Sequence, residues 1–276
     1  MKRLFILPGL LLFLMSFTLL SDNSSSTEGV DYAEVGQDNF TKGEKLTYKV
    51  HYGFLNAGEA TMEVHPKLYK VNNRVCYKAT VFGKSTGAFD MMLRIRDTWG
   101  AYIDSGAIIP QRSFRNIEEG KYRLKETVNF NYASKRAEFE WDRKGDISRD
   151  TFEIHSKIQD IVSGYFYLRT LNYNKLSMGD TIKVDAIFED KVYDFQLKYM
   201  GKGVVSTKFG KIDGILLTPI MPENTLFKGG ESIRFWMSDD KNKIPVKIEA
   251  DMFLGAVAMD LTSYEGLKHP IQFRKK

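Results

Sequence analysis

The chain has 276 residues, a formal net charge of +5 and a single cysteine, Cys76. One cysteine cannot form an intramolecular disulfide, which excludes a small secreted domain framed by disulfides. Basic residues are interspersed with acidic ones, and no Lys/Arg cluster with interleaved aromatics indicates a nucleic-acid groove. Cys76 lies in an alternating, strand-like run, so we expect it to be a buried, inert thiol.

The first twenty residues predict a secretory signal peptide. Lys2 and Arg3 precede an apolar run over residues 4–20, and a polar stretch begins at Ser21. A basic end, a short apolar centre and a small-residue exit are typical of such a peptide, and no basic stop-transfer flank follows. We therefore expect residues 1–21 to be removed. The mature protein would be periplasmic or otherwise exported, soluble and without a membrane span.

Residues 22–39 contain acidic but no basic residues and lack apolar periodicity, which is typical of a flexible tether. Apolar and polar side chains alternate from Leu46 to Tyr52 and again from Glu59 to Val64, which predicts a β-hairpin. Further strand-like runs follow at 73–83, 89–103, 107–117, 121–130, 134–142, 147–154, 180–188, 191–200, 203–208, 211–218, 230–238, 244–251 and 254–264.

Residues 156–172 break this alternation. Ser156 and Gln159 form a capping-box pattern, and the apolar residues that follow at helical spacing surround the helix almost completely. The sequence thus predicts a mainly β protein, a curved antiparallel sheet or barrel of roughly a dozen or more strands with one buried helix at about 156–172. We expect residues 40–276 to form one β domain, or two half-sheets, 40–155 and 173–276, joined by the helix.

Several motifs that suggest chemistry are better explained as turns or strands. Gly83–Gly87 lacks the upstream glycine of a phosphate-binding loop, and Ser163 lacks the Gly-x-Ser-x-Gly context of a nucleophile. Residues 238–243 lack the glycine and the terminal glutamate of a helix-loop-helix calcium site. Because the histidines lack metal-ligand spacing, we expect no metal and no cofactor. They are His51, His65, His155 and His269.

Three stretches of the chain together resemble a known family. They are Phe40–Tyr48 with Asn56–Ala60, Asp160–Arg169, and Phe235–Asp240 with Ile244–Glu249 and Leu254–Gly255. In combination they resemble a bacterial exported-protein family, domain of unknown function 3108, over essentially all of residues 40–265. The resemblance implies a periplasmic, mostly antiparallel β protein with a curved or barrel-like sheet, loosely similar to capsule-operon barrels and periplasmic lipoprotein carriers. It implies no activity and no catalytic residue.

Abundant aromatic side chains and one apolar helix favour a ligand pocket between that helix and the concave sheet. We expect Phe166, Tyr167 and Trp236 to line it. The leading hypothesis is a non-enzymatic envelope protein that binds or scaffolds an amphiphilic component. This component would be a lipid, a lipoprotein or a polysaccharide; envelope proteins are the other class of partner.

Two other functions remain open at this stage. A periplasmic glycan or peptidoglycan hydrolase would need two carboxylates about 5–10 Å apart in one cleft. The candidates for such a pair are Asp97, Glu126, Asp185 and Asp240. A structural subunit of an assembly would instead expose an apolar surface patch.

Overall fold

The computed structural model describes residues 34–155, 157–188, 191–220, 231–253 and 255–275. The predicted signal peptide and residues 22–33 of the predicted tether lie outside the described residues. Residues 34–39 lie against the body of the protein, because the Val35 amide donates to the Gly106 carbonyl at 2.8 Å and the Asn39 side chain donates to the Lys241 carbonyl at 2.7 Å. Among the described residues, no helix has the length and apolar character needed to cross a membrane.

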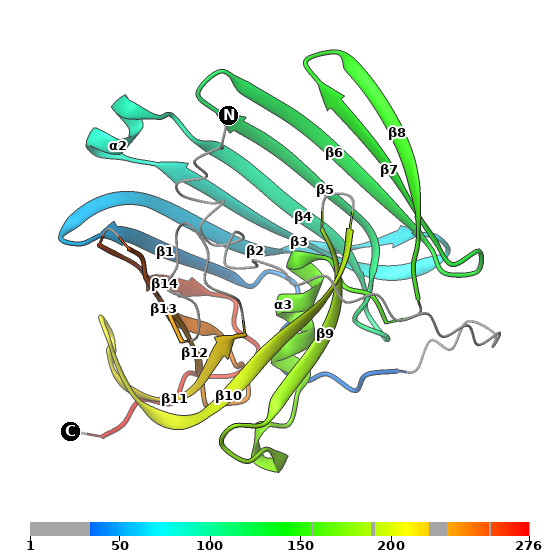
Figure 1. The fold of residues 1–276 in the computed structure, drawn as a ribbon. Helices are drawn as coiled ribbons and strands as arrows, with labels where there is room; N and C mark the ends of the chain where they lie inside the picture. Colours follow the sequence, from blue (N-terminus) through cyan, green and yellow to red (C-terminus); the bar gives the residue numbers. More distant parts are fainter. Residues whose placement is uncertain (1–33, 156, 189–190, 221–230, 254, 276) are drawn as a thin grey trace.

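Fourteen antiparallel strands form one continuous, strongly curved sheet (Figure 1). The strands are β1 (Lys45–Tyr52), β2 (Leu55–Val71), β3 (Arg74–Ser85), β4 (Arg96–Asp104), β5 (Pro110–Glu119), β6 (Tyr122–Asn131), β7 (Arg136–Arg143), β8 (Asp146–Glu153), β9 (Thr181–Phe188), β10 (Lys191–Thr207), β11 (Gly210–Pro219), β12 (Ile233–Ser238), β13 (Pro245–Asp251) and β14 (Ala256–Glu265). Apart from β8 and β9, which form the two edges, strands that are consecutive in sequence pair with each other, and β1 pairs with β14. The predicted mainly β fold is confirmed as a curved sheet that ends at β8 and β9, not as a closed barrel.

Alternating side chains determine which face of each strand is buried. Leu46, Tyr48 and Val50 of β1 are buried, whereas Lys45 and Lys49 are exposed. This period of two places one face of the sheet against the core. The runs 191–200 and 203–208, predicted as two strands, form the single strand β10, whose register shifts between Tyr199 and Gly201. Gly201 has a φ of +96°, a conformation that lets the bulge bend the strand without ending it.

The prediction of strand over 89–103 is wrong in its first part, where the chain forms the short helix α2 (Gly87–Met92). Gly87, with a φ of +56°, turns the chain out of β3. The Asp90 side chain accepts from Ser85 and pairs with Arg96, and the Phe89 ring packs edge-on against Tyr52. These local contacts hold a helical turn before β4 begins.

The predicted buried helix is present as α3 (Ile161–Thr170), inside the concave side of the sheet (Figure 1). It begins later than predicted, because Asp160 is the N-cap and Ser163 completes the capping box. Gln159 forms a parallel bridge with Ala186 of β9 instead of capping the helix. A one-turn 3-10 helix, η1 (Tyr173–Lys175), follows α3.

Candidate functional site

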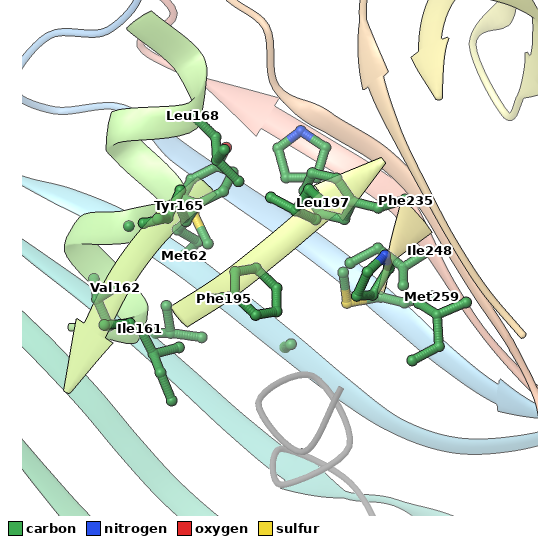
Figure 2. Close-up of a pocket in the computed structure, with 18 of the residues that line it drawn as sticks. Met62, Ile161, Val162, Tyr165, Leu168, Phe195, Leu197, Phe235, Ile248 and Met259 are labelled. Atoms are coloured by element: carbon green, nitrogen blue, oxygen red, sulfur yellow. The ribbon is translucent and has the colours of Figure 1, made fainter. Parts of the chain in front are cut away.

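A cavity of about 120 Å³ lies between α3 and the concave face of the sheet. Figure 2 shows α3 contributing one wall and β10, β12, β13 and β14 contributing residues across from it. We call this space the main cavity. It is lined by Tyr48, Ala60, Thr61, Met62, Val81, Asp160, Ile161, Val162, Gly164, Tyr165, Leu168, Val184, Ala186, Phe195, Leu197, Pro219, Ile233, Phe235, Pro245, Ile248 and Met259.

The walls of the main cavity are almost wholly apolar. Small residues at Ala60, Gly164 and Ala186 leave the space open where larger side chains would fill it. The Tyr48 hydroxyl donates to the Pro245 carbonyl at 3.1 Å, so this polar group is satisfied within the wall. Burial raises the pKa of the Tyr48 and Tyr165 hydroxyls well above the usual value, which keeps both neutral. Apart from Asp160, the cavity therefore offers an uncharged surface to a hydrocarbon group.

Asp160 is the exception, a carboxyl group in an apolar wall. Its Oδ1 accepts from the amides of Val162 and Ser163 at 2.7 and 3.2 Å, which caps α3. Its Oδ2 is buried and has no hydrogen-bond partner among the described residues. Burial raises the pKa of this carboxyl to about 6, against the opposing hydrogen bonds from the helix amides and Ser163.

Asp160 also borders a second space of about 30 Å³, which we call the polar cavity. There the Arg115 guanidinium donates to Glu126 Oε2 at 2.7 Å, and the Trp141 indole donates to the same oxygen at 2.6 Å. The guanidinium of Arg115 also lies 5.2 Å from the centre of the Trp99 ring. Charge and aromatic surface are thus combined around a space large enough for a water-sized group.

The three sequence stretches that resemble the family meet next to the main cavity. Arg169, at the end of α3, is fully buried and forms an ion pair with Glu44. Its other nitrogens donate to the carbonyls of Asn39 and Asn242 at 2.9 Å. One side chain therefore connects the helix to the segment before β1 and to the loop before β13.

The three residues predicted to line a pocket are not among those that line the main cavity. Phe166 faces the core from α3, with its ring 4.8 Å from that of Phe40. Tyr167 is half-buried and packs against two apolar clusters of the core, one that contains Phe166 and one that contains Leu168. The Trp236 indole packs so closely against Gly203 that a Cβ atom on residue 203 would lie only 3.0 Å from the ring.

Asp160 and Phe235 line the main cavity, although the sequence analysis did not name either of them as a lining residue. The signal for Asp160 was present, since an aspartate directly before an apolar helical run, with Ser163 three residues later, is typical of an N-cap. For Phe235, the alternation of β12 is the signal, because adjacent strand residues point to opposite faces. Phe235 lines the main cavity and Trp236 does not.

The four carboxylates considered for hydrolysis lie in separate environments. Asp97 is buried and accepts from the Glu118 amide at 2.8 Å, whereas Glu126 pairs with Arg115. Asp185 is half-exposed beside His155. Asp240 accepts from Ser238 and from the amides of the turn that follows. Each carboxylate therefore has a structural contact of its own in the described structure.

Cys76 is buried as expected, and burial raises the pKa of its thiol to about 12. Within the described ranges, no group of three His, Cys, Asp or Glu side chains is placed to hold a metal ion.

Comparison with models of protein families identifies the family of this chain. The model of the protein family of unknown function DUF3108 matches residues 47–262. The chain belongs to this family. The resemblance carried by the three sequence stretches is thereby confirmed. A search of curated proteins finds no match.

One solved structure agrees with the fold, and two others show a weaker likeness. A β-barrel-like protein of the family DUF1849 from Brucella abortus is 8% identical, with a TM-score of 0.52 over 82% of this chain and 98% of that one. A Bacteroides fragilis protein described as exported, with a YmcC-like fold, is 8% identical with a TM-score of 0.34, covering 84% of this chain and 99% of that one. A protein of Parabacteroides distasonis described as a lipoprotein is 10% identical with a TM-score of 0.28, covering 87% and 100%. At these identities the likeness concerns the fold alone.

Proposed function

We propose that this protein is an exported, non-enzymatic binding protein of the bacterial envelope that takes the apolar part of an amphiphile into the main cavity. The observation that carries the proposal is a cavity of about 120 Å³ with almost wholly apolar walls beneath a buried helix. Most empty space in a protein core is filled, because close packing contributes to stability. A retained apolar space next to α3 therefore favours a ligand over a packing defect.

The source of the lining residues supports the same proposal. Tyr48, Phe235 and Pro245 belong to the stretches that resemble the family, as do the α3 residues of the wall. Those stretches thus contribute to the cavity as well as to turns and strand ends. Export is supported by the basic and apolar N-terminal sequence, and N-terminal sequencing of protein from fractionated cells would test cleavage near Ser21.

The size of the main cavity limits what it accepts. An engineered cavity of about 150 Å³ binds benzene, so about 120 Å³ accommodates a segment of roughly four to six carbons. The ligand would therefore place a short apolar segment in the main cavity and leave its other parts outside that cavity. A lipid or the acyl group of a lipoprotein meets this requirement better than a polysaccharide, whose hydroxyls would be buried without partners.

A cavity-filling substitution tests the proposal. Ala186 of β9 lines the main cavity, so Ala186→Leu should occupy it. Ala258 of β14 neighbours the cavity residue Met259 but points to the other face, which makes Ala258→Leu the matched control. Titration with 1-hexanol, followed by methyl NMR of Ile161 and Leu197, should give saturable shifts in the parent and the control. We expect Ala186→Leu to abolish them.

Two results would contradict the proposal. One is a parent protein whose cavity methyls do not respond to 1-hexanol. The other is an Ala186→Leu variant that is folded and binds 1-hexanol as the parent does. If instead the parent binds 1-hexanol and the variant does not, native mass spectrometry of protein released gently from envelopes would identify the natural ligand by its mass.

A further inference from the structure

The main cavity and the polar cavity meet at the N-terminus of α3. Asp160, Ile161 and Val162 line both of them. The first space is apolar, and the second is bordered by Arg115, Glu126 and the Trp99 indole. An amphiphile with a short polar group on an apolar chain has the same division of character.

Two buried polar atoms of residues that line the polar cavity have no hydrogen-bond partner within the described part of the chain. They are Oδ2 of Asp160 and Nε1 of Trp99, whose residues are only 7% and 8% exposed. Buried donors and acceptors in native proteins are nearly always hydrogen-bonded, so a pair left open beside a cavity indicates a bound group. One atom is a donor and the other an acceptor.

We propose that the amphiphile places a small uncharged group that both donates and accepts, a hydroxyl or a primary amide, in the polar cavity. Its oxygen accepts from the Trp99 indole, and its O–H or N–H donates to the Asp160 carboxylate. This inference rests on the proposed function, because the chain of the same ligand occupies the main cavity. The polar cavity of about 30 Å³ admits such a group but not a phosphate or a sugar.

The charges at the junction favour an uncharged polar group. Arg115 and Glu126 already form an ion pair, so they leave little net charge to attract an ionic headgroup. The pKa of Asp160 is raised to about 6 by burial, so at pH 7.5 its carboxylate is mostly ionised and accepts hydrogen bonds. A ligand carboxylate placed beside it would be repelled, and an ammonium group, which only donates, would leave the Trp99 indole without an acceptor.

Three ligands of similar size separate these contributions. 1-Hexanol donates and accepts, pentyl methyl ether only accepts, and hexanoate is anionic at pH 7.5. One hydrogen bond to an ionised carboxylate corresponds to about a 10- to 100-fold change in affinity. The parent should therefore bind 1-hexanol about 10- to 100-fold more tightly than the ether, and hexanoate most weakly. The readout is again the methyl NMR titration.

Two conservative variants assign the contacts. Asp160→Ser keeps a capping oxygen but lacks the second acceptor, so it should remove the preference for 1-hexanol over the ether and improve hexanoate binding. Trp99→Phe keeps a ring beside Arg115 and Phe188 but lacks the N–H, so it should weaken 1-hexanol and the ether by a similar factor. Methyl spectra of both variants confirm that they are folded.

The outcomes distinguish this inference from the proposed function. If both folded variants bind 1-hexanol as the parent does, while Ala186→Leu abolishes binding, the inference is overturned and the proposed function stands. Tighter binding of hexanoate than of 1-hexanol to the parent also overturns the inference alone. If no ligand binds the parent, both fail together.

Discussion

The Arg169 side chain is held by contacts on each of its three guanidinium nitrogens. It is fully buried, and its guanidinium is shared between the Glu44 carboxylate, two backbone carbonyls and the surrounding rings of Phe40 and Phe166. A buried charge is tolerated only when it is paired and hydrogen-bonded, and here each of the three guanidinium nitrogens has a hydrogen-bond partner. The sequence placed Arg169 on the helix, but Glu44 is 125 residues away and no local pattern links the two.

We predict that Arg169→Met destabilises the protein by about 3–5 kcal/mol, because it leaves the buried Glu44 carboxylate without its counter-ion. Urea denaturation at neutral pH measures the loss. The matched control is Arg149→Met, which removes an arginine that also pairs with a glutamate, Glu140, but is 71% exposed. An exposed pair contributes about 0–1 kcal/mol, so this control should be nearly neutral. Equal losses in the two variants would show that burial of the Arg169 pair is unimportant.

Asp97 gives the protein a dependence on pH. Burial raises its pKa to about 6 from the ordinary value of 3.8, so the folded state binds a proton more tightly than the unfolded state does. Its contribution to stability is then fully present below about pH 4 and is lost as pH rises through about 6.

We expect Asp97→Asn to remove this loss. Relative to the parent, the variant should gain about 2 kcal/mol of stability between pH 4 and pH 7.5, since one unit of pKa shift corresponds to about 1.4 kcal/mol. Urea denaturation of both proteins across that range measures the difference. Parallel stability profiles for the two proteins would mean that the Asp97 carboxyl has the same proton affinity folded and unfolded.

At the scale of elements, α3 shows what periodicity can and cannot predict. The near-continuous apolar surface correctly indicated a buried helix. The start was misplaced because two capping patterns overlap, and backbone pairing decided between them. The Gln159 amide donates to the Asp185 carbonyl and the Ile187 amide donates to the Gln159 carbonyl, both at 2.8 Å. Gln159 is thereby held as a bridge to β9, and the helix begins after Asp160.

Phe166 tests the organising role of α3. Its side chain is fully buried and packs edge-on against Phe40 and Tyr165, so Phe166→Ala should cost about 3–5 kcal/mol through lost contacts and an unfilled cavity. The thermal midpoint should fall strongly. Lys157→Ala, at an exposed position before the helix, should leave it almost unchanged. A Phe166→Ala protein that melts like the parent would show that α3 is not packed as described.

At the scale of the whole molecule, the hairpins were predictable, but the strand pairing that joins the two halves of the chain was not. Most strands pair with the next strand in sequence, and turn residues such as Lys144 and Gly145 mark where the chain reverses. The pairing of β1 with β14, which places Lys45 opposite Glu265, joins the two halves of the chain into one sheet. Neither strand carries a signal for that partner. The main cavity depends on this pairing, because both halves line it.

The two edges of the open sheet are protected differently. β9 is covered by Gln159, whose backbone exchanges hydrogen bonds with it. β8 has no such cover among the described residues, and its side chains are almost all exposed. Asp146, Arg149 and Asp150 place charges along β8, a common protection of a free edge against pairing with another chain.

This difference predicts the pattern of hydrogen exchange. The outward amides of β8 lie on an uncovered edge with little buried side-chain surface, so they should open with a small free energy. The Ile187 amide of β9 donates to the Gln159 carbonyl at 2.8 Å. It should exchange at least about a hundredfold more slowly than the β8 amides, although β9 is also an edge strand of the sheet. Amides of β1, flanked by β2 and β14, provide the fully protected reference. Equal exchange at Ile187 and along β8 would mean that the segment before α3 does not close that edge, and the polar cavity beneath Asp160 would then lose one of its walls.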